Sequence, residues 1–215
     1  MTLSPSLRRF VLTTHITSSV GWVGALAVFL AHAIASLTSQ DEQLVRAACL
    51  AMSLCAWFVI LPLSLTSLAT GIIQALGTAW GVVRHYWVVF KLLLTALATA
   101  VLLLKLAPIS FLAEAASKTT FSSADVVGLQ TSLLVHAIGG LLVLLTATVL
   151  AIYKPQGVTP YGLRKLREEG RAFDSFAGTP RWVKGFGWLG AVLIVLMLIM
   201  FLYGSHGPGV HMQHG

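Results

Sequence analysis

The sequence predicts an all-α protein, a polytopic membrane bundle of five transmembrane helices with its amino terminus in the cytoplasm. Of 215 residues, 57% are hydrophobic and only 10% are charged, which is a composition typical of integral membrane proteins. The apolar residues also fall in uninterrupted runs that are long enough to span a bilayer. The lysines and arginines gather beside these runs on one predicted side of the membrane, which sets the orientation.

Five apolar segments are predicted as transmembrane helices, and the second is the longest. At about 30 residues, or about 45 Å, it exceeds a hydrocarbon core of roughly 30 Å, so we expect it to bend at Pro62. The five segments are Phe10 to Leu37, Ala47 to Leu76, Tyr86 to Ala107, Val126 to Tyr153, and Phe186 to Tyr203.

Positive charge predicts the orientation, because cytoplasmic loops are enriched in lysine and arginine. An odd number of spans places the two termini on opposite sides. Eleven basic residues then share a side with the amino terminus, against Arg46, Lys105 and Lys118 on the other side. We therefore expect a bacterial cytoplasmic (inner) membrane protein with an external carboxyl terminus.

The chain divides into four predicted regions. Residues 1–153 form a four-helix transmembrane bundle, 154–184 a basic cytoplasmic loop, 185–204 the fifth transmembrane helix, and 205–215 a His-rich external tail. The loop contains a short helical stretch that we expect to lie on anionic lipid headgroups, with docking of a partner protein as the alternative. The net charge of +7 sits mainly beside the membrane segments, which argues against nucleic-acid binding.

His15 lies about 8 Å inside the cytoplasmic boundary of the first segment. A titratable group in hydrocarbon is costly, so it is a candidate for metal, cofactor or proton chemistry. The positions 15, 18, 22, 25, 29 and 32 follow a three-four spacing. His15, Trp22 and His32 are therefore predicted to face the bundle interior.

His136 lies near the predicted midplane of the fourth segment, with Gly139 and Gly140 one turn later. A porphyrin needs an axial imidazole and a flat surface free of branched side chains, so this helix is a candidate haem site. The alternative is that the glycines permit close helix packing while His136 bonds a hydroxyl such as that of Ser67 or Thr66.

Lys91 lies about 8 Å deep in the third segment, at the depth predicted for His15. One expectation is that its ammonium reaches back to the interface. If the first and third segments face each other, the imidazole and the ammonium converge and form a cradle for a carboxylate or a haem propionate.

The carboxyl tail reads SHGPGVHMQHG, which places His206, His211, Met212 and His214 together as candidate metal ligands. Imidazoles with a thioether suit copper. The apolar segments contain no acidic residue, which argues against a carboxylate proton relay or a sodium site. No Walker loop, zinc-protease motif or nucleophile elbow is present.

Two spacings resemble known membrane families: six residues between His15 and Trp22, and three between Trp87 and Lys91. The chain resembles most closely an uncharacterised bacterial multi-pass integral membrane family. That resemblance rests on the stretches HITSSVGWVGALAVFLA, SLATGIIQALGTAWGVVRHYWVVFKLLLT and AIYKPQGVTPYGLRK. It is distantly similar to the copper-resistance D family and to the HemJ-type protoporphyrinogen IX oxidase.

Similarity to the haem-dependent oxidase implies that His15 is the haem-associated histidine, that Lys91 is essential, and that His136 is a second axial ligand. The fifth segment, the basic loop and the tail are not part of that oxidase's pattern. Similarity to the copper group implies a metal-passing role instead.

Three functions are therefore expected. The leading one is binding of haem b through His15 or His32 together with His136, with Lys91 and Trp22 in the same site, for redox or electron transfer with a redox partner protein. The second is a carrier of copper or another metal, and the third is a non-catalytic assembly or scaffold protein in the membrane.

Overall fold

The computed structural model of the protein describes residues 3–77, 81–118, 123–168, 180–186, 188 and 192. The chain forms two compact units, Met1–Gly170 and Arg171–Gly215. Within the second unit, residues 181–186 are helical and the rings of Trp182 and Phe186 meet edge to face with centroids 5.9 Å apart.

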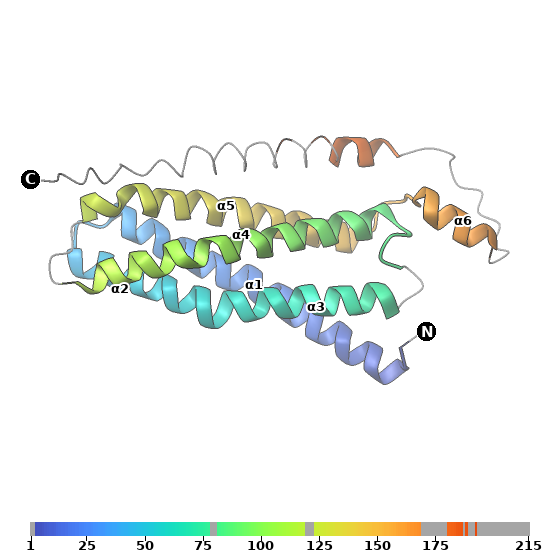
Figure 1. The fold of residues 1–215 in the computed structure, drawn as a ribbon, viewed down its shortest axis with the longest axis horizontal. Helices are drawn as coiled ribbons and strands as arrows, with labels where there is room; N and C mark the ends of the chain where they lie inside the picture. The colour runs from blue at the N-terminus through green and yellow to red at the C-terminus, as the bar shows by residue number, and fades with distance from the viewer. Residues whose placement is uncertain are drawn as a thin grey trace, which may run out of the picture. The chain divides into compact units, whose positions relative to one another are not determined.

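Helices make up nearly all of the first unit, as Figure 1 shows. Its described residues contain no strand and a single isolated bridge, between His85 and Val158. The elements in chain order are α1 (Pro5–Thr38), α2 (Glu42–Cys55), the π-helix η1 (Ala56–Ile60), α3 (Leu61–Gly77), α4 (Tyr86–Ser117), α5 (Ser123–Tyr153) and α6 (Pro160–Glu168).

Four helical stretches are long and apolar enough to cross a membrane, which confirms the all-α class and supports a membrane protein. They are Pro5–Thr38, Glu42–Gly77, Tyr86–Ser117 and Val126–Tyr153. They correspond to the first four predicted segments. Most of the fifth predicted segment, 186–203, lies outside the described residues.

The first span, α1, begins at a capped terminus. Ser4 accepts a hydrogen bond from the backbone N–H of Leu7, and Pro5 occupies the first turn, where its missing N–H costs nothing. The buried side of α1 contains Val11, His15, Ser18, Trp22, Ala25, Phe29, Ala33 and Ser36. The prediction that His32 lies on this buried side is wrong. The buried side continues from Phe29 to Ala33, because residues four apart lie on nearly the same side of a helix with 3.6 residues per turn. His32 is only half-buried.

The second span is continuous from α2 through α3, with η1 in its middle. The π-helix ends two residues before Pro62, where the sequence predicts an irregularity. Proline removes a backbone N–H and crowds the carbonyl four residues earlier. A π-bulge absorbs that conflict by widening one turn.

The span α4 runs ten residues beyond the predicted end at Ala107, as far as Ser117, with Pro108 inside the helix. Prediction of an end at Ala107 is therefore wrong. Apolar and small residues continue the buried face past the proline through Ile109, Leu112 and Ala116. Packing of this face outweighs the single lost hydrogen bond.

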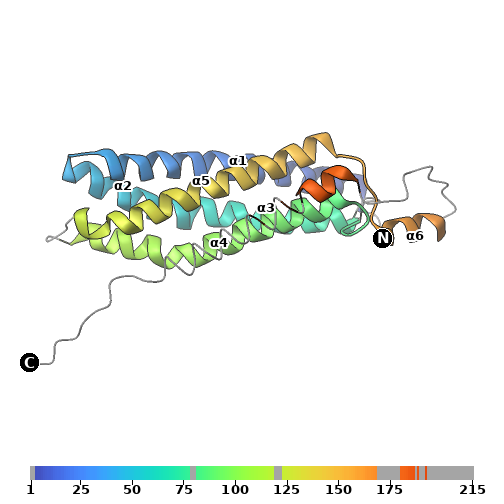
Figure 2. The same ribbon diagram turned by 90° about the horizontal axis from the view of Figure 1, so that it is seen from above.

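In the bundle, α1 and α4 are each packed against α2, α3 and α5, so they lie across the interior from each other. Figure 2 gives the view from above. One core cluster joins the spans and includes Trp22, Phe29, Met52, Leu112 and Leu133. The core therefore runs along the axis of the bundle.

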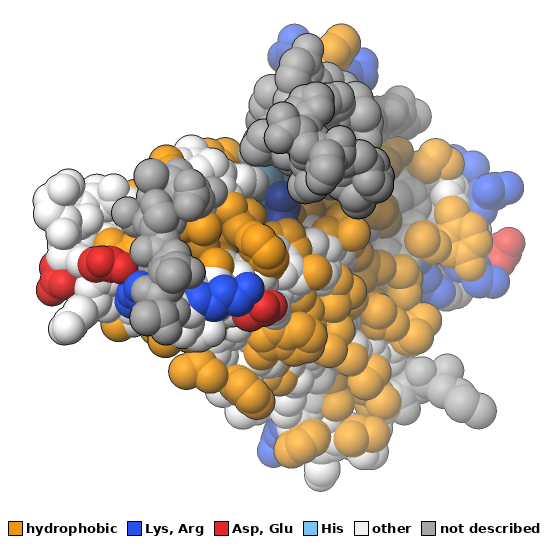
Figure 3. All heavy atoms as spheres, turned by 60° about the vertical axis from the view of Figure 1, so that its left-hand side comes forward, with side chains coloured by type: hydrophobic (Ala, Val, Ile, Leu, Met, Phe, Trp, Pro, Cys, Tyr) orange, Lys and Arg blue, Asp and Glu red, His pale blue; other side chains and the backbone are white. Residues whose placement is uncertain are grey.

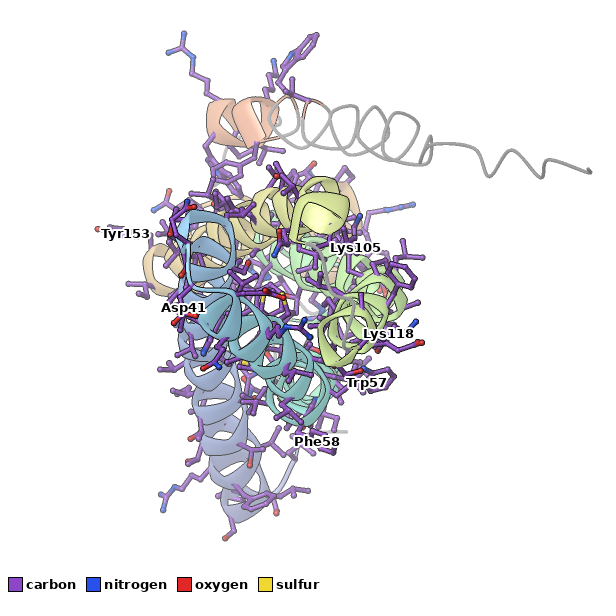
Figure 4. The ribbon with its side chains drawn as sticks, turned by 90° about the vertical axis from the view of Figure 1, so that its left-hand side faces the viewer. Asp41, Trp57, Phe58, Lys105, Lys118 and Tyr153 are labelled. Carbon is purple, nitrogen blue, oxygen red and sulfur yellow. The ribbon has the colours of Figure 1, made fainter. Side chains whose placement is uncertain are left out.

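The outer surface of the bundle is apolar. Orange side chains cover much of the face in Figure 3, while charged ones gather mostly toward the ends. Phe58 is 76% exposed, and Figure 4 shows it and Trp57 pointing away from the bundle axis. Such a surface suits lipid tails as its surroundings.

Candidate functional site

His15 and Lys91 meet in the interior of the bundle. The Nζ atom of Lys91 lies 2.9 Å from Nε2 of His15. His15 is 6% exposed, and Lys91 is partly buried. The expected convergence of the two side chains is therefore confirmed. Their hydrogen bond joins α1 to α4 across the interior.

The other nitrogen of the His15 ring faces α3. Its Nδ1 lies 3.0 Å from the carbonyl oxygen of Ser67 and 3.1 Å from Oγ1 of Thr70. A carbonyl can only accept, so the ring proton is assigned to Nδ1, which donates to Ser67. Nε2 then carries the lone pair and accepts from the Lys91 ammonium.

Close packing on α3 holds the imidazole in place. A Cβ atom at Gly71 would lie 3.2 Å from Cε1 of His15, so this glycine permits the ring to approach the helix. Thr70 donates its hydroxyl to the carbonyl of Thr66 over 2.6 Å, which leaves its oxygen lone pairs facing His15. The orientation of the ring is therefore fixed by backbone and hydroxyl groups of one helix.

Further polar groups of α1, α3 and α4 surround the pair. The hydroxyls of Ser19 and Ser67 lie 2.7 Å apart. Gln74 donates to the carbonyl of Val11 over 3.2 Å, and Thr95 donates to the carbonyl of Lys91 over 2.8 Å. The pair therefore sits in a polar layer of an otherwise apolar bundle.

The sequence interpretation missed most of the α3 contribution. It considered Ser67 and Thr66 only as partners of His136, whereas the structure places Ser67 on His15. The available signal was the spacing of Ser67, Thr70 and Gln74, which puts three polar side chains on one side of a membrane helix.

His32 and His136 each bond a carbonyl of their own helix. Nδ1 of His32 lies 2.8 Å from the Val28 oxygen, and Nδ1 of His136 lies 2.6 Å from the Ser132 oxygen. As in His15, the ring proton belongs on Nδ1 and the lone pair on Nε2. All three intramembrane histidines thus have the tautomer that binds metals through Nε2.

His15 and His136 do not come together. Two contacts show how the antiparallel helices α1 and α5 are aligned: Gly140 packs against Leu26, and Gln130 bonds the carbonyl of Ser36. In each contact the two residue numbers add to 166, so residues whose numbers have this sum lie at the same level along the two helices. His136 is therefore level with position 30 of α1. That position is 15 residues, or about 22 Å, from His15.

His32 lies near the level of His136, and its ring bonds the Val28 carbonyl of its own helix. His136 likewise bonds the Ser132 carbonyl of its own helix. The predicted pairing of His15 with His136 is therefore not assembled, whereas the pairing of His32 with His136 stays a prediction.

The remaining predicted residues have other surroundings. Trp22 is 2% exposed and belongs to the core cluster. His206, His211, Met212 and His214 lie outside the described residues. Within the ranges described above, no three His, Cys, Asp or Glu side chains form a metal-binding group.

Chemically, the His15–Lys91 pair consists of two bases that share one proton. The sequence has no Asp or Glu at residues 3–40, 43–77 or 86–113, so these stretches of the three helices supply no counter-charge. The pair can exchange a proton between imidazole and amine, attract an anionic group, or offer Nε2 to a metal when Lys91 turns away.

Comparison with protein-family models, curated proteins and solved structures gave no match.

Proposed function

We propose that the protein binds a b-type haem in the membrane and serves redox or electron transfer, with His15 as the axial ligand and Lys91 as its functional partner. The observation that carries the proposal is the state of the His15 ring. Its Nδ1–H is fixed on the Ser67 carbonyl at 3.0 Å, as the outer nitrogen of a metal-binding histidine usually is. Its Nε2 lone pair points into the bundle interior toward Lys91.

The residues present fit a haem ligand in tautomer and orientation. Haem would supply reversible one-electron chemistry at this position. Lys91 currently occupies the Nε2 lone pair, so ligation requires that its flexible four-carbon stem carries the ammonium away from the ring.

His15 is preferred to His136 as the haem ligand because groups of other helices hold its ring in place. The His15 ring is buried and hydrogen-bonded by two other helices. His136 bonds within its own helix and is only half-buried. Ligation to a site held by several helices gives a fixed geometry, which redox tuning needs.

We also propose that the end of the bundle containing Arg8, Arg9 and Arg84 faces the cytoplasm of a bacterium. This end brings together the start of α1 and the end of α3, since Leu3 N–H bonds the Gly77 carbonyl over 3.4 Å. The opposite end contains Asp41 and Glu42. An excess of cations on one side supports a cytoplasmic position of that side.

The function is tested by expressing the full chain with added haem precursor, purifying it in detergent and recording a reduced-minus-oxidised absorption spectrum. We expect a Soret band and an α-band from the wild-type protein. They should be lost in His15→Ala and retained in His136→Ala, which is the matched control on α5.

A colourless wild-type protein would contradict the proposed function. A spectrum lost in His136→Ala but kept in His15→Ala would contradict the assignment of the ligand. Both variants need the same helical circular dichroism as the wild type, so that loss of haem is separated from loss of fold.

A further inference from the structure

The helix α6 carries exposed positive charge at one end of the bundle. Its last turn is basic, with Lys165 and Arg167, and Arg164 precedes them. Arg164 and Arg167 are exposed, whereas Lys165 forms an ion pair of 3.0 Å with Glu168. The two arginines therefore carry most of the charge that α6 presents to its surroundings.

Hydrogen bonds attach the start of α6 to the segment that leads into α4. Thr159 donates its backbone N–H to the Arg84 carbonyl over 2.9 Å and its hydroxyl to the Val83 carbonyl. The same hydroxyl accepts from Gly162 N–H at 3.0 Å. This contact requires glycine, because a Cβ atom at position 162 would overlap the Arg84 carbonyl. The helix is thus held in a defined place and is not merely tethered.

The place of attachment is the boundary of the membrane spans. α5 ends at Tyr153 and α4 begins at Tyr86, and Tyr86 N–H bonds the Gly157 carbonyl over 3.3 Å. Figure 1 shows α6 at the end of the bundle where α4 starts. Aromatic residues such as these tyrosines settle at the level of lipid headgroups.

We propose that Arg164 and Arg167 bind the phosphate of an anionic phospholipid headgroup, beside a shallow hollow lined by Tyr161, Arg164, Lys165 and Glu168. Guanidinium groups match phosphate oxygens with paired hydrogen bonds. Tyr161, which is 48% exposed, supplies an amphipathic ring of the kind found at membrane interfaces. We refer to Arg164 and Arg167 as the phosphate site.

A lipid is preferred to a soluble acidic partner because of location and charge. The phosphate site is bonded through Thr159 to the first residues beyond a membrane span, where headgroups are always present. A basic segment beside a span gains about 1 kcal/mol for each Lys or Arg near an anionic leaflet. This inference does not depend on haem binding.

The test uses the full chain in nanodiscs of phosphatidylcholine containing a trace of spin-labelled phosphatidylglycerol or spin-labelled phosphatidylcholine. The motionally restricted fraction of each label gives the selectivity for the anionic lipid. We expect the wild type to select phosphatidylglycerol. Arg164→Gln with Arg167→Gln should lower this selectivity by more than the roughly fivefold for each arginine that charge alone contributes at low salt, because it also removes the paired hydrogen bonds to the phosphate.

The matched control is Arg8→Gln with Arg9→Gln, which removes the same charge from exposed positions of α1. It should lower the selectivity by less than the α6 double variant does, because it removes only the general attraction of charge near an anionic leaflet. An equal loss of selectivity in the two double variants would overturn the proposal, because it would show that the lipid responds to the total positive charge at that end of the bundle and not to a specific site. A wild-type protein without lipid selectivity would also overturn the proposal, and is the result expected if the site binds a protein. Complete competition by millimolar inorganic phosphate would overturn it as well, and is the result expected if the site binds a free anion.

Discussion

The hydrogen bond between His15 and Lys91 predicts a measurable coupling between the two residues. A hydrogen bond to a charged group contributes about 1.5–3 kcal/mol, whereas polar contacts between membrane helices average about 0.6 kcal/mol. The Nζ–Nε2 distance is 2.9 Å and His15 is 6% exposed, so the pair is short and shielded from water. We therefore expect a coupling free energy of about 1.5–3 kcal/mol.

The perturbation is a double-mutant cycle of His15→Leu and Lys91→Met, with the free energy of unfolding measured in bicelles by steric trapping. Each single variant should destabilise the protein, and the double variant should be less destabilised than the sum of the two. Lys105→Met is the matched control, because it removes a lysine from the same helix without removing a partner of His15. Coupling below about 0.6 kcal/mol, or equal coupling with the Lys105 control, would refute this account of the site.

Three further predictions follow from single contacts. Gly71→Val should displace the His15 ring and reduce haem binding, since a Cβ added at position 71 would lie 3.2 Å from Cε1 of the ring and valine adds two methyl groups beyond it; an unchanged spectrum would argue against a fixed ring. Gln130→Leu should change the free energy of unfolding by less than about 1 kcal/mol, because removal of the buried Oε1, which has no partner among the described residues, is offset by loss of the Nε2 bond to the Ser36 carbonyl; a larger change in either direction would contradict this balance. Thr159→Val should speed hydrogen exchange of α6 while leaving the exchange of α1 unchanged, and equal exchange in α6 would show that Thr159 does not hold it.

The sequence predicts most of the fold because long apolar runs in a membrane leave the backbone one common solution, the helix. The bounds of the spans are harder to predict from the sequence. Ala107 looks like an end because Pro108 follows it, but the helix continues to Ser117. Whether a proline ends a helix depends on the packing beyond it, which a single sequence does not reveal.

The candidate site is predicted only in part. His15 and Lys91 are each five residues from the predicted start of their apolar segment, Phe10 or Tyr86, so their meeting follows once the two helices face each other. The role of Ser67 and the separation of His15 from His136 depend on how the antiparallel helices are aligned along their axes. That alignment is set by contacts such as Gly140 with Leu26, which leave no distinctive pattern in the residues.

The most direct measurement is nitrogen-15 NMR of the haem-free protein in lipid, labelled at histidine and lysine. The account predicts a neutral His15 ring with its proton on Nδ1 and a through-space correlation between Nε2 and the Lys91 Nζ. A His15 ring protonated on Nε2, or one without any correlation to Lys91, would contradict it.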